Sequence, residues 1–249
     1  MSRKVSPEHE LSESSDQANS LETFEDLYKA RSDLRIHKWL NYFHVYDTHM
    51  GRFRRQPVKF LEIGVQRGGS AQLFREYLGP RAQVVGVDID PACAAHADGH
   101  SLQIEIGDQA DPDFLSYIKQ KHGPFDIVLD DGGHKASQIL TSFEYLFSAI
   151  TLGGVYLIED TCCQYWSGSA FIDRGKRAWN NFIIDLNNRL NADMGKQQLF
   201  EHWHIPVEKR KEQLHTQGED RFIHSIHLYE SIVAIEKKQR RLPYSELRD

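Results

Sequence analysis

Two acidic pairs, each following a short apolar run, have the residue types and spacing of a metal site. Asp130 and Asp131 begin the stretch DDGGH, and Glu159 and Asp160 follow the run GVYLI. If these runs are neighbouring parallel strands, about 4.8 Å apart, the acidic side chains meet at one edge of a sheet. Asp131, Glu159 and Asp160 then offer an oxygen-rich site that suits Mg²⁺ or Mn²⁺ better than zinc.

His134 lies three residues after Asp131 and is the candidate general base, because the pKa of a histidine is close to neutrality. A bound ion would hold two vicinal substrate oxygens and ease the loss of a hydroxyl proton, so we predict catalytic roles for Asp131 and His134. The alternative is structural. Asp131 and Asp160 would then cap the helices that follow them, and His134 would bond within its own loop.

The first apolar run ends in a glycine-rich turn of the kind that approaches a ligand closely. Gly64 comes two residues after Glu62, and the turn continues through Gly68 to Ser70, where a helix is predicted to begin. Glycine lets the backbone turn sharply there, and the helix N-terminus behind it favours ligand binding. The spacing is not the GxGxxG of a dinucleotide-binding loop, so a purely structural turn remains an alternative.

Acidic residues also end the next three predicted strands, and together they indicate one ligand. Asp88 is placed to accept the hydroxyls of a ribose, Asp108 and Gln109 to contact an adenine edge, and Asp130 to hold an ammonium group. Any one of them alone would more often be a cap or turn residue. As a set they predict S-adenosylmethionine as the cofactor.

The order of elements predicts the fold that brings these residues together. Five apolar runs lack strict alternation, as strands buried on both faces do, and helical segments separate them. We therefore expect a doubly wound, Rossmann-like α/β fold with five parallel strands. The strands are predicted at 58–65, 82–90, 102–108, 125–131 and 154–160, the helices at 70–78, 111–122 and 136–150, and a final two-stranded hairpin at 222–230 and 231–238.

The remaining segments are assigned by composition. We expect a disordered tail over 1–20, an N-terminal helical cap over 21–56 and a charged tail over 239–249. The methyltransferase domain then covers 57–238, with a lid insertion at about 167–221 whose helix carries Trp179, Phe182 and Leu186 on one face.

The overall composition excludes several classes of partner. The chain has 249 residues, 40% apolar and 27% charged, with a formal net charge of −6. This charge gives no surface for nucleic acid or anionic membrane, and no apolar run reaches the roughly 20 residues of a membrane span. Three cysteines are too few for a disulfide framework and favour a cytoplasmic protein. The expected partner is a small molecule with a hydroxyl acceptor, and a homo-oligomer remains open.

Six stretches resemble the macrolide sugar O-methyltransferases, the family of the macrocin and mycinamicin methyltransferases. They are FLEIGVQRGGS, VVGVDID, IGDQADPDFL, FDIVLDDGGH, TSFEYLF and GGVYLIEDTCCQYW, and the ending IHSIHLYESIVAIEKK resembles that family's closing hairpin. The resemblance implies S-adenosylmethionine, Mg²⁺ and methylation of a sugar hydroxyl of a natural product. A departure is Gly133, where the family usually has serine.

The same resemblance implies roles for individual residues. Asp131, Glu159 and Asp160 match the family's metal ligands, and His134 matches its base. Glu62, Asp88 and Asp108 match cofactor-contacting positions, and the helix with Tyr42 and Tyr46 would border the substrate pocket.

Tyr165 and Trp166 follow the last acidic pair and are candidates to pack against a sugar ring, with plain packing beneath a lid as the alternative. The predicted reaction is in-line transfer of the sulfonium methyl to a substrate oxygen, with His134 taking the proton. Three alternatives remain: an acceptor such as a catechol, a nicotinamide-dependent oxidoreductase, and a non-catalytic binding protein of this fold.

Overall fold

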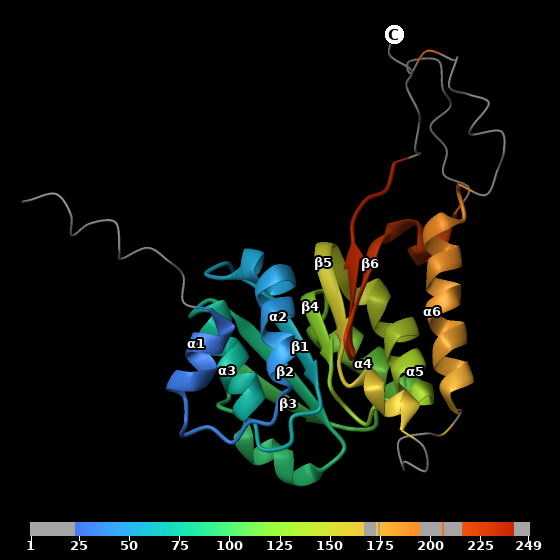
Figure 1. Ribbon diagram of the computed structural model, residues 1–249. Coiled ribbons are helices and arrows are strands. Elements are labelled where there is room, and N and C mark those ends of the chain that lie inside the picture. Colours follow the sequence, from blue (N-terminus) through green and yellow to red (C-terminus); the bar gives the residue numbers. More distant parts are fainter. Residues whose placement is uncertain (1–22, 167–172, 174, 195–205, 207–215, 242–249) are drawn as a thin grey trace, which may run out of the picture.

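The computed structural model describes residues 23–166, 173, 175–194, 206 and 216–241. Seven strands form one sheet, in the order β3-β2-β1-β4-β5-β7-β6 (Figure 1). The strands are β1 (Lys59–Ile63), β2 (Gln83–Asp88), β3 (Leu102–Ile106), β4 (Phe125–Asp130), β5 (Ile150–Ile158), β6 (Ile223–Tyr229) and β7 (Ile232–Lys237).

The first five strands are parallel, and β7 and β6 join them as an antiparallel hairpin beside β5. This confirms the predicted fold. Because β1 lies in the middle between β2 and β4, the chain reverses its direction of travel across the sheet there. Loops that follow β1 and β4 diverge at such a point and leave a crevice at the carboxyl edge.

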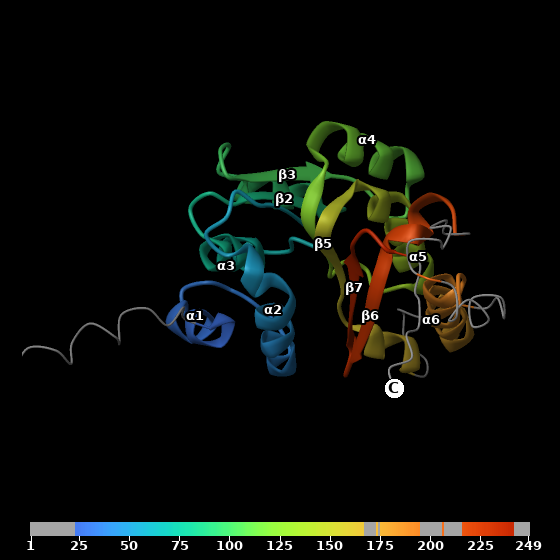
Figure 2. The same ribbon diagram turned by 90° about the horizontal axis from the view of Figure 1, so that it is seen from above.

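Helices cover both faces of the sheet. Figure 2 shows α1 (Phe24–Ala30), α2 (Phe43–Met50) and α3 (Gly69–Leu78) on one side, and α4 (Pro112–His122), α5 (Ala136–Leu146) and α6 (Gly175–Asn191) on the other. Successive strand residues point to opposite faces, so each strand contributes to two cores. In β4, for example, Ile127 belongs to the core with α1–α3, and Val128 to the core with α4–α6.

Two predicted segments take a defined form. The described part of the helical cap, from Thr23, contains α1 and α2, and α1 begins with a capping box between Thr23 and Asp26. In the predicted lid insertion, α6 packs its apolar residues Trp179, Phe182 and Leu186 into the core beside α5. That helix is therefore part of the helical layer on this face of the sheet.

Other predictions lie outside the described residues. These are the tail over 1–20, most of the insertion on either side of α6, and the end of the charged tail from 242. The domain boundaries stay a prediction. No helix among the described residues is long and apolar enough to cross a membrane.

Gly64, at the end of β1, holds the crevice in its observed shape. Its φ is +96°, and a Cβ there would lie 2.0 Å from the carbonyl oxygen of Asp131. The loops after β1 and β4 can therefore approach each other only with glycine at this position. Gly153 has the same φ of +96° but open space where its Cβ would be.

We predict that Gly64→Ala lowers the free energy of unfolding by about 2 kcal/mol more than Gly153→Ala. Both substitutions place alanine in the left-handed region, at a cost of roughly 1–2 kcal/mol, but only the first adds a clash between backbones. Urea unfolding of the two variants measures the difference. Equal losses would show that the loops separate freely.

Candidate active site

Three polar side chains after β4 and β5 converge at the carboxyl edge of the sheet. Ligand atoms of Asp131, His134 and Asp160 all lie within 4.8 Å of one another. His134 Nε2 is 3.5 Å from Asp160 Oδ2 and 3.9 Å from Asp131 Oδ1. The strand register explains the meeting, because Asp130 at the end of β4 pairs with Ile158 at the end of β5.

The backbone is in an unfavourable conformation at this cluster. His134 has φ of 55° and Asp160 has φ of 53°, values that side chains with a Cβ rarely adopt. Surrounding groups hold both residues there. The Gln164 side chain donates to the His134 carbonyl, and the Asp160 N–H donates to the Tyr42 hydroxyl at 3.2 Å. Backbone strain of this kind is typical of functional sites, where it aims side chains at a ligand.

Glu159, the third predicted metal ligand, is placed differently from the other two. Its carboxylate is 1% exposed, with Oε2 accepting from Lys38 Nζ at 2.8 Å and Oε1 from the Tyr46 hydroxyl at 2.6 Å. Burial and the nearby Asp131 carboxylate raise the pKa of Glu159, although Lys38 opposes them. In this structure His134, and not Glu159, completes the group around Asp131 and Asp160.

Lys38 is a central residue of the site that the sequence analysis missed. Its ammonium contacts Asp131 Oδ2 at 2.5 Å as well as Glu159, and its side chain is 2% exposed. Burial alone would lower the pKa of Lys38, but the carboxylates of Asp131, Glu159 and Glu62 raise it, so the group stays charged. The spacing of Lys38, Tyr42 and Tyr46, four residues apart, is the only sequence signal that could have indicated it.

Tyr42 and Tyr46 also lie elsewhere than predicted. Both side chains are fully buried, so neither borders an open pocket. The Tyr42 hydroxyl donates to Asp160 Oδ1 at 2.7 Å, while that of Tyr46 donates to Glu159. These tyrosines thus orient the two acidic residues after β5 from behind.

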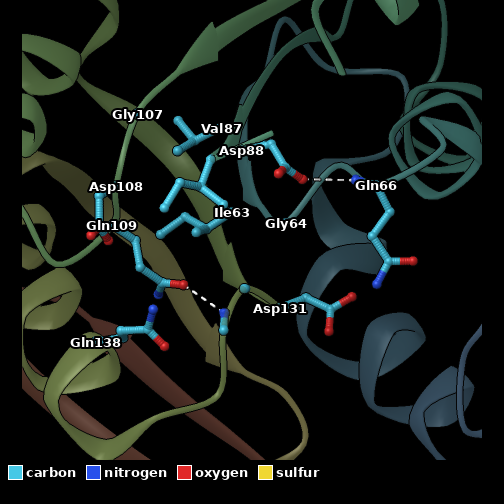
Figure 3. A pocket seen from close by; sticks show the side chains of 13 residues that line it. Ile63, Gly64, Gln66, Val87, Asp88, Gly107, Asp108, Gln109, Asp131 and Gln138 are labelled. Atoms are coloured by element: carbon cyan, nitrogen blue, oxygen red, sulfur yellow. Dashed lines mark hydrogen bonds between the residues drawn. The ribbon is translucent and has the colours of Figure 1, made fainter. Parts of the chain in front are cut away.

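A cavity of about 190 Å³ lies beside the cluster, over the ends of β1, β2 and β3 (Figure 3). Ile63 and Val87 form its apolar floor, and the carboxylates of Asp88 and Asp108 stand on opposite sides. Of the predicted cofactor residues, Gly64, Asp88, Asp108 and Gln109 line it. Gln66 and Gln138 line it as well and were not predicted, because single glutamines in a loop and a helix carry no pattern.

Asp88 is fixed in the cavity wall by backbone N–H groups. Oδ2 accepts from Val65 and Gln66 at 2.8 and 2.9 Å, and Oδ1 accepts from Asp90 at 2.9 Å. Partial burial by itself raises the pKa of Asp88, but these hydrogen bonds outweigh it and lower the pKa below its ordinary value. The side chain is therefore ionised at neutral pH.

The other predicted cofactor residues do not line this cavity. Asp130 is 1% exposed and accepts from Gln109 Nε2 at 2.9 Å and from the Tyr156 hydroxyl at 3.2 Å. Gln109, which does line the cavity, accepts from the Gly133 N–H through its amide oxygen, and its Nε2 donates both to Asp130 and to Ser142 of α5. Gly68, the residue that precedes α3, has a φ of 73° and packs against the side chain of His96.

Glu62 is fully buried, and only one of its two carboxylate oxygens has a hydrogen-bond partner. Ser70 donates to Oε1 at 2.5 Å, whereas Oε2 is buried without a hydrogen-bond partner. Burial raises the pKa of Glu62 to about 7, although Lys38 and Ser70 oppose the shift. An unpaired buried carboxylate oxygen is costly, which favours a role in binding a cationic group.

A second cavity, of about 230 Å³, adjoins the first and contains the cluster. It shares Gly64, Gln66 and Asp131 with the first cavity, and it is also lined by Ser70, Lys38, His134, Asp160 and Trp166. Trp166 leads to a third cavity of about 600 Å³ between the hairpin and α6. Tyr165 and Trp166, 51% and 45% exposed, both line this third cavity.

A further group of possible metal ligands lies away from these cavities. His49, His227 and Glu236 have ligand atoms within 4.8 Å of one another. Glu236 is already paired with Arg52 and Lys238, at 3.1 and 3.0 Å. Two positive side chains on the only carboxylate disfavour a cation there.

Comparison with known proteins identifies the part of the chain that contains the crevice. Residues 61–161 match a protein family described as a methyltransferase domain. They are a methyltransferase domain. The chain is 32% identical over 77% of its length to mycinamicin VI 2''-O-methyltransferase of Micromonospora griseorubida, and 31% identical over 85% to demethylmacrocin O-methyltransferase of Streptomyces fradiae. The predicted resemblance is confirmed.

The chain spans about half the length of these relatives, 47% and 53%. Among solved structures, it is similar to the MycE methyltransferase of mycinamycin biosynthesis in complex with Mg, SAH and mycinamycin VI. The TM-score is 0.66 and the identity 28%, over 91% of this chain and 55% of that one. The methyltransferase domain therefore shares both sequence and fold with an enzyme whose structure holds a metal and a cofactor product.

From the raised pKa of the buried Glu62 we predict that the stability of the protein depends on pH. The pKa of Glu62 is about 7 in the folded protein, against 4.5 for an ordinary glutamate, so the folded state binds the proton more tightly. Its contribution to stability is therefore complete below about pH 4.5 and is lost as the pH rises through 7. Between pH 5 and 8, wild type should lose about 2–3 kcal/mol more unfolding free energy than Glu62→Gln.

Urea unfolding at the two pH values measures this difference. Glu144→Gln serves as the control, because Glu144 is exposed and should keep the wild-type pH dependence. The same pH dependence in wild type and Glu62→Gln would contradict the prediction.

Proposed function

We propose that the protein is an S-adenosylmethionine-dependent, divalent-metal-assisted O-methyltransferase that acts on a sugar hydroxyl of a natural product. One observation carries the proposal. Two cavities meet at Asp131 and Gly64, one with carboxylates above an apolar floor and the other with the Asp131–His134–Asp160 cluster. This arrangement supports a donor and an acceptor that bind on either side of a single carboxylate.

The first cavity fits the donor. S-adenosylmethionine carries a ribose and an adenine, and it has positive charges at the sulfonium and the ammonium. The ionised Asp88 suits the ribose hydroxyls, and Asp108 beside the apolar floor suits the adenine. Glu62, which accepts from Ser70 in the wall of the second cavity, supports a cationic group nearby, because a positive charge would favour its ionised form.

The cluster in the second cavity fits a divalent ion. Asp131 and Asp160 supply hard oxygen ligands from neighbouring strand ends, which is the donor type that Mg²⁺ and Mn²⁺ prefer. Glu159, the family's third ligand by resemblance, stands beside them. When bound, the ion would lower the pKa of an acceptor hydroxyl.

The chain's own residues would then position the reaction and remove its proton. Asp131 and Asp160, held from behind by Lys38 and Tyr42, keep the acceptor oxygen beside the donor cavity. His134 Nε2, on the same side, accepts the hydroxyl proton. The sulfonium is already activated, so most of the rate arises from alignment of the acceptor oxygen with the methyl group.

The third cavity is the proposed binding place of the acceptor. Trp166 borders both the cluster's cavity and the 600 Å³ space, so a molecule there can reach the cluster past an indole face. Aromatic faces pack well against the apolar side of a sugar ring. The relatives named above are O-methyltransferases named for mycinamicin VI and demethylmacrocin. The resemblance to macrolide sugar O-methyltransferases supports a sugar hydroxyl over a catechol. The match to a methyltransferase domain disfavours an oxidoreductase. Oligomeric state and a cytoplasmic location stay predictions.

Asp88→Asn should weaken S-adenosylmethionine binding by at least about tenfold, because the neutral amide loses a charge-assisted contact with the ribose. Asp98→Asn is a matched control. Asp98 also accepts from three backbone N–H groups, those of His100, Ser101 and Leu102, but lines none of the cavities above. Calorimetric titration should give wild-type affinity for the control, and equal losses in both variants would remove Asp88 from the cofactor site.

The decisive experiment measures transfer of labelled methyl from S-adenosylmethionine to glycosylated polyketides. We expect turnover that needs Mg²⁺ or Mn²⁺ and stops with excess chelator. His134→Ala should reduce it by about 10²–10⁴-fold if His134 is the base. His224→Ala, an exposed histidine on β6, should not.

Full turnover in chelator would exclude the metal. A protein that binds S-adenosylmethionine but methylates no sugar-containing acceptor would overturn the proposed substrate class.

A further inference from the structure

Lys38 places a positive charge among the carboxylates that are proposed to hold the ion. It comes from the segment between α1 and α2, far in sequence from the strands it contacts. Its ammonium lies 2.5 Å from Asp131 Oδ2 and 2.8 Å from Glu159 Oε2. The ring of Phe74, 5.8 Å away, covers another side of it.

The ammonium balances charges that would otherwise repel one another. Asp131, Glu159 and Asp160 bring three carboxylates to two neighbouring strand ends, and Glu159 is 1% exposed. A buried carboxylate without a cationic partner is strongly destabilising, and the hydroxyls of Tyr42 and Tyr46 bring no charge. Lys38 therefore makes this arrangement stable when no ion is bound.

The same contact also affects Asp131 itself. With Oδ2 held by Lys38, Oδ1 is the oxygen that faces His134, at 3.9 Å from Nε2. Asp131 thus contacts the Lys38 ammonium through one carboxylate oxygen and faces His134 with the other. A divalent ion at the cluster must lie close to the ammonium, and the two like charges repel across a short distance.

We propose that Lys38 is an internal counter-ion of this site, a positioning residue that stabilises the ion-free protein and weakens the affinity for the divalent ion. The proposal rests on the metal-assisted function above, and it concerns the occupancy of that site. Weaker binding lets the ion exchange with the medium between turnovers, while the carboxylates remain in place.

The test is Mn²⁺ binding to the full chain, by calorimetry, together with thermal unfolding with and without Mn²⁺. Lys38→Met should unfold at lower temperature than wild type without the ion, bind Mn²⁺ about tenfold or more tightly, and gain more in melting temperature from it. Lys38→Arg, which keeps the charge, should bind Mn²⁺ as wild type does. Lys29→Met removes an exposed lysine of α1 and should change neither measurement.

Lys38→Gln keeps a hydrogen-bond donor without the charge and should bind Mn²⁺ more tightly, even if Lys38→Met folds poorly. A Lys38→Met protein that folds only with Mn²⁺ present also supports the proposal. Unchanged or weaker Mn²⁺ binding in the Met and Gln variants would overturn it. If wild type and all variants fail to bind Mn²⁺, the metal-assisted function itself is wrong.

Discussion

The structure depends on one electrostatic arrangement, in which carboxylates that follow β4 and β5 converge on one edge of the sheet and are held there by residues of α2 and of the segment before it. Like charges do not gather without partners, and here the partners come from Lys38, Tyr42 and Tyr46. Tyr42 and Tyr46 are fully buried and line none of the three cavities, whereas Lys38 lines the second cavity beside Asp131. The N-terminal helices are therefore part of the site, although none of these tyrosines is exposed.

The packing of the sheet explains why this arrangement can be rigid. Both faces of β1 and β4 are buried, and the alternation of their side chains fills one core with α1–α3 and another with α4–α6. The strand ends are thus fixed, and so are the first residues of the loops that follow them. Tyr46 belongs to the first core and also donates to Glu159, so the packing of α2 directly sets the place of an acidic side chain.

Gly64 and the strained residues His134 and Asp160 show how the crevice is kept open at the switch point. The backbone of the loop after β4 passes so near Gly64 that no side chain fits between them. The two left-handed residues then turn their side chains toward each other. Trp166 also lines a third cavity, whose volume of about 600 Å³ exceeds that of the first cavity. The lining of this third cavity comes from α6, the hairpin and the turn after β5.

The order of strands and helices could be predicted because it depends on local patterns of apolar and polar residues. Continuous apolar runs separated by amphipathic segments specify a parallel sheet with covered faces, and strand ends in such a sheet share one edge. From this alone, the meeting of Asp131 with Asp160 and the placing of Asp88 and Asp108 beside one cavity follow.

Other features arise only in three dimensions. Lys38 lies 93 residues from Asp131 and 121 from Glu159, and no periodicity relates them. Glu159 carries the same chemistry as Asp160, but its carboxylate is buried against Lys38 and Tyr46, whereas Asp160 lines the second cavity. The sequence by itself determined the edge at which the acidic groups gather, since strand periodicity is local. Only the tertiary structure decided which of them line a cavity and which are paired with a buried lysine, since burial and ion pairing depend on contacts between distant segments.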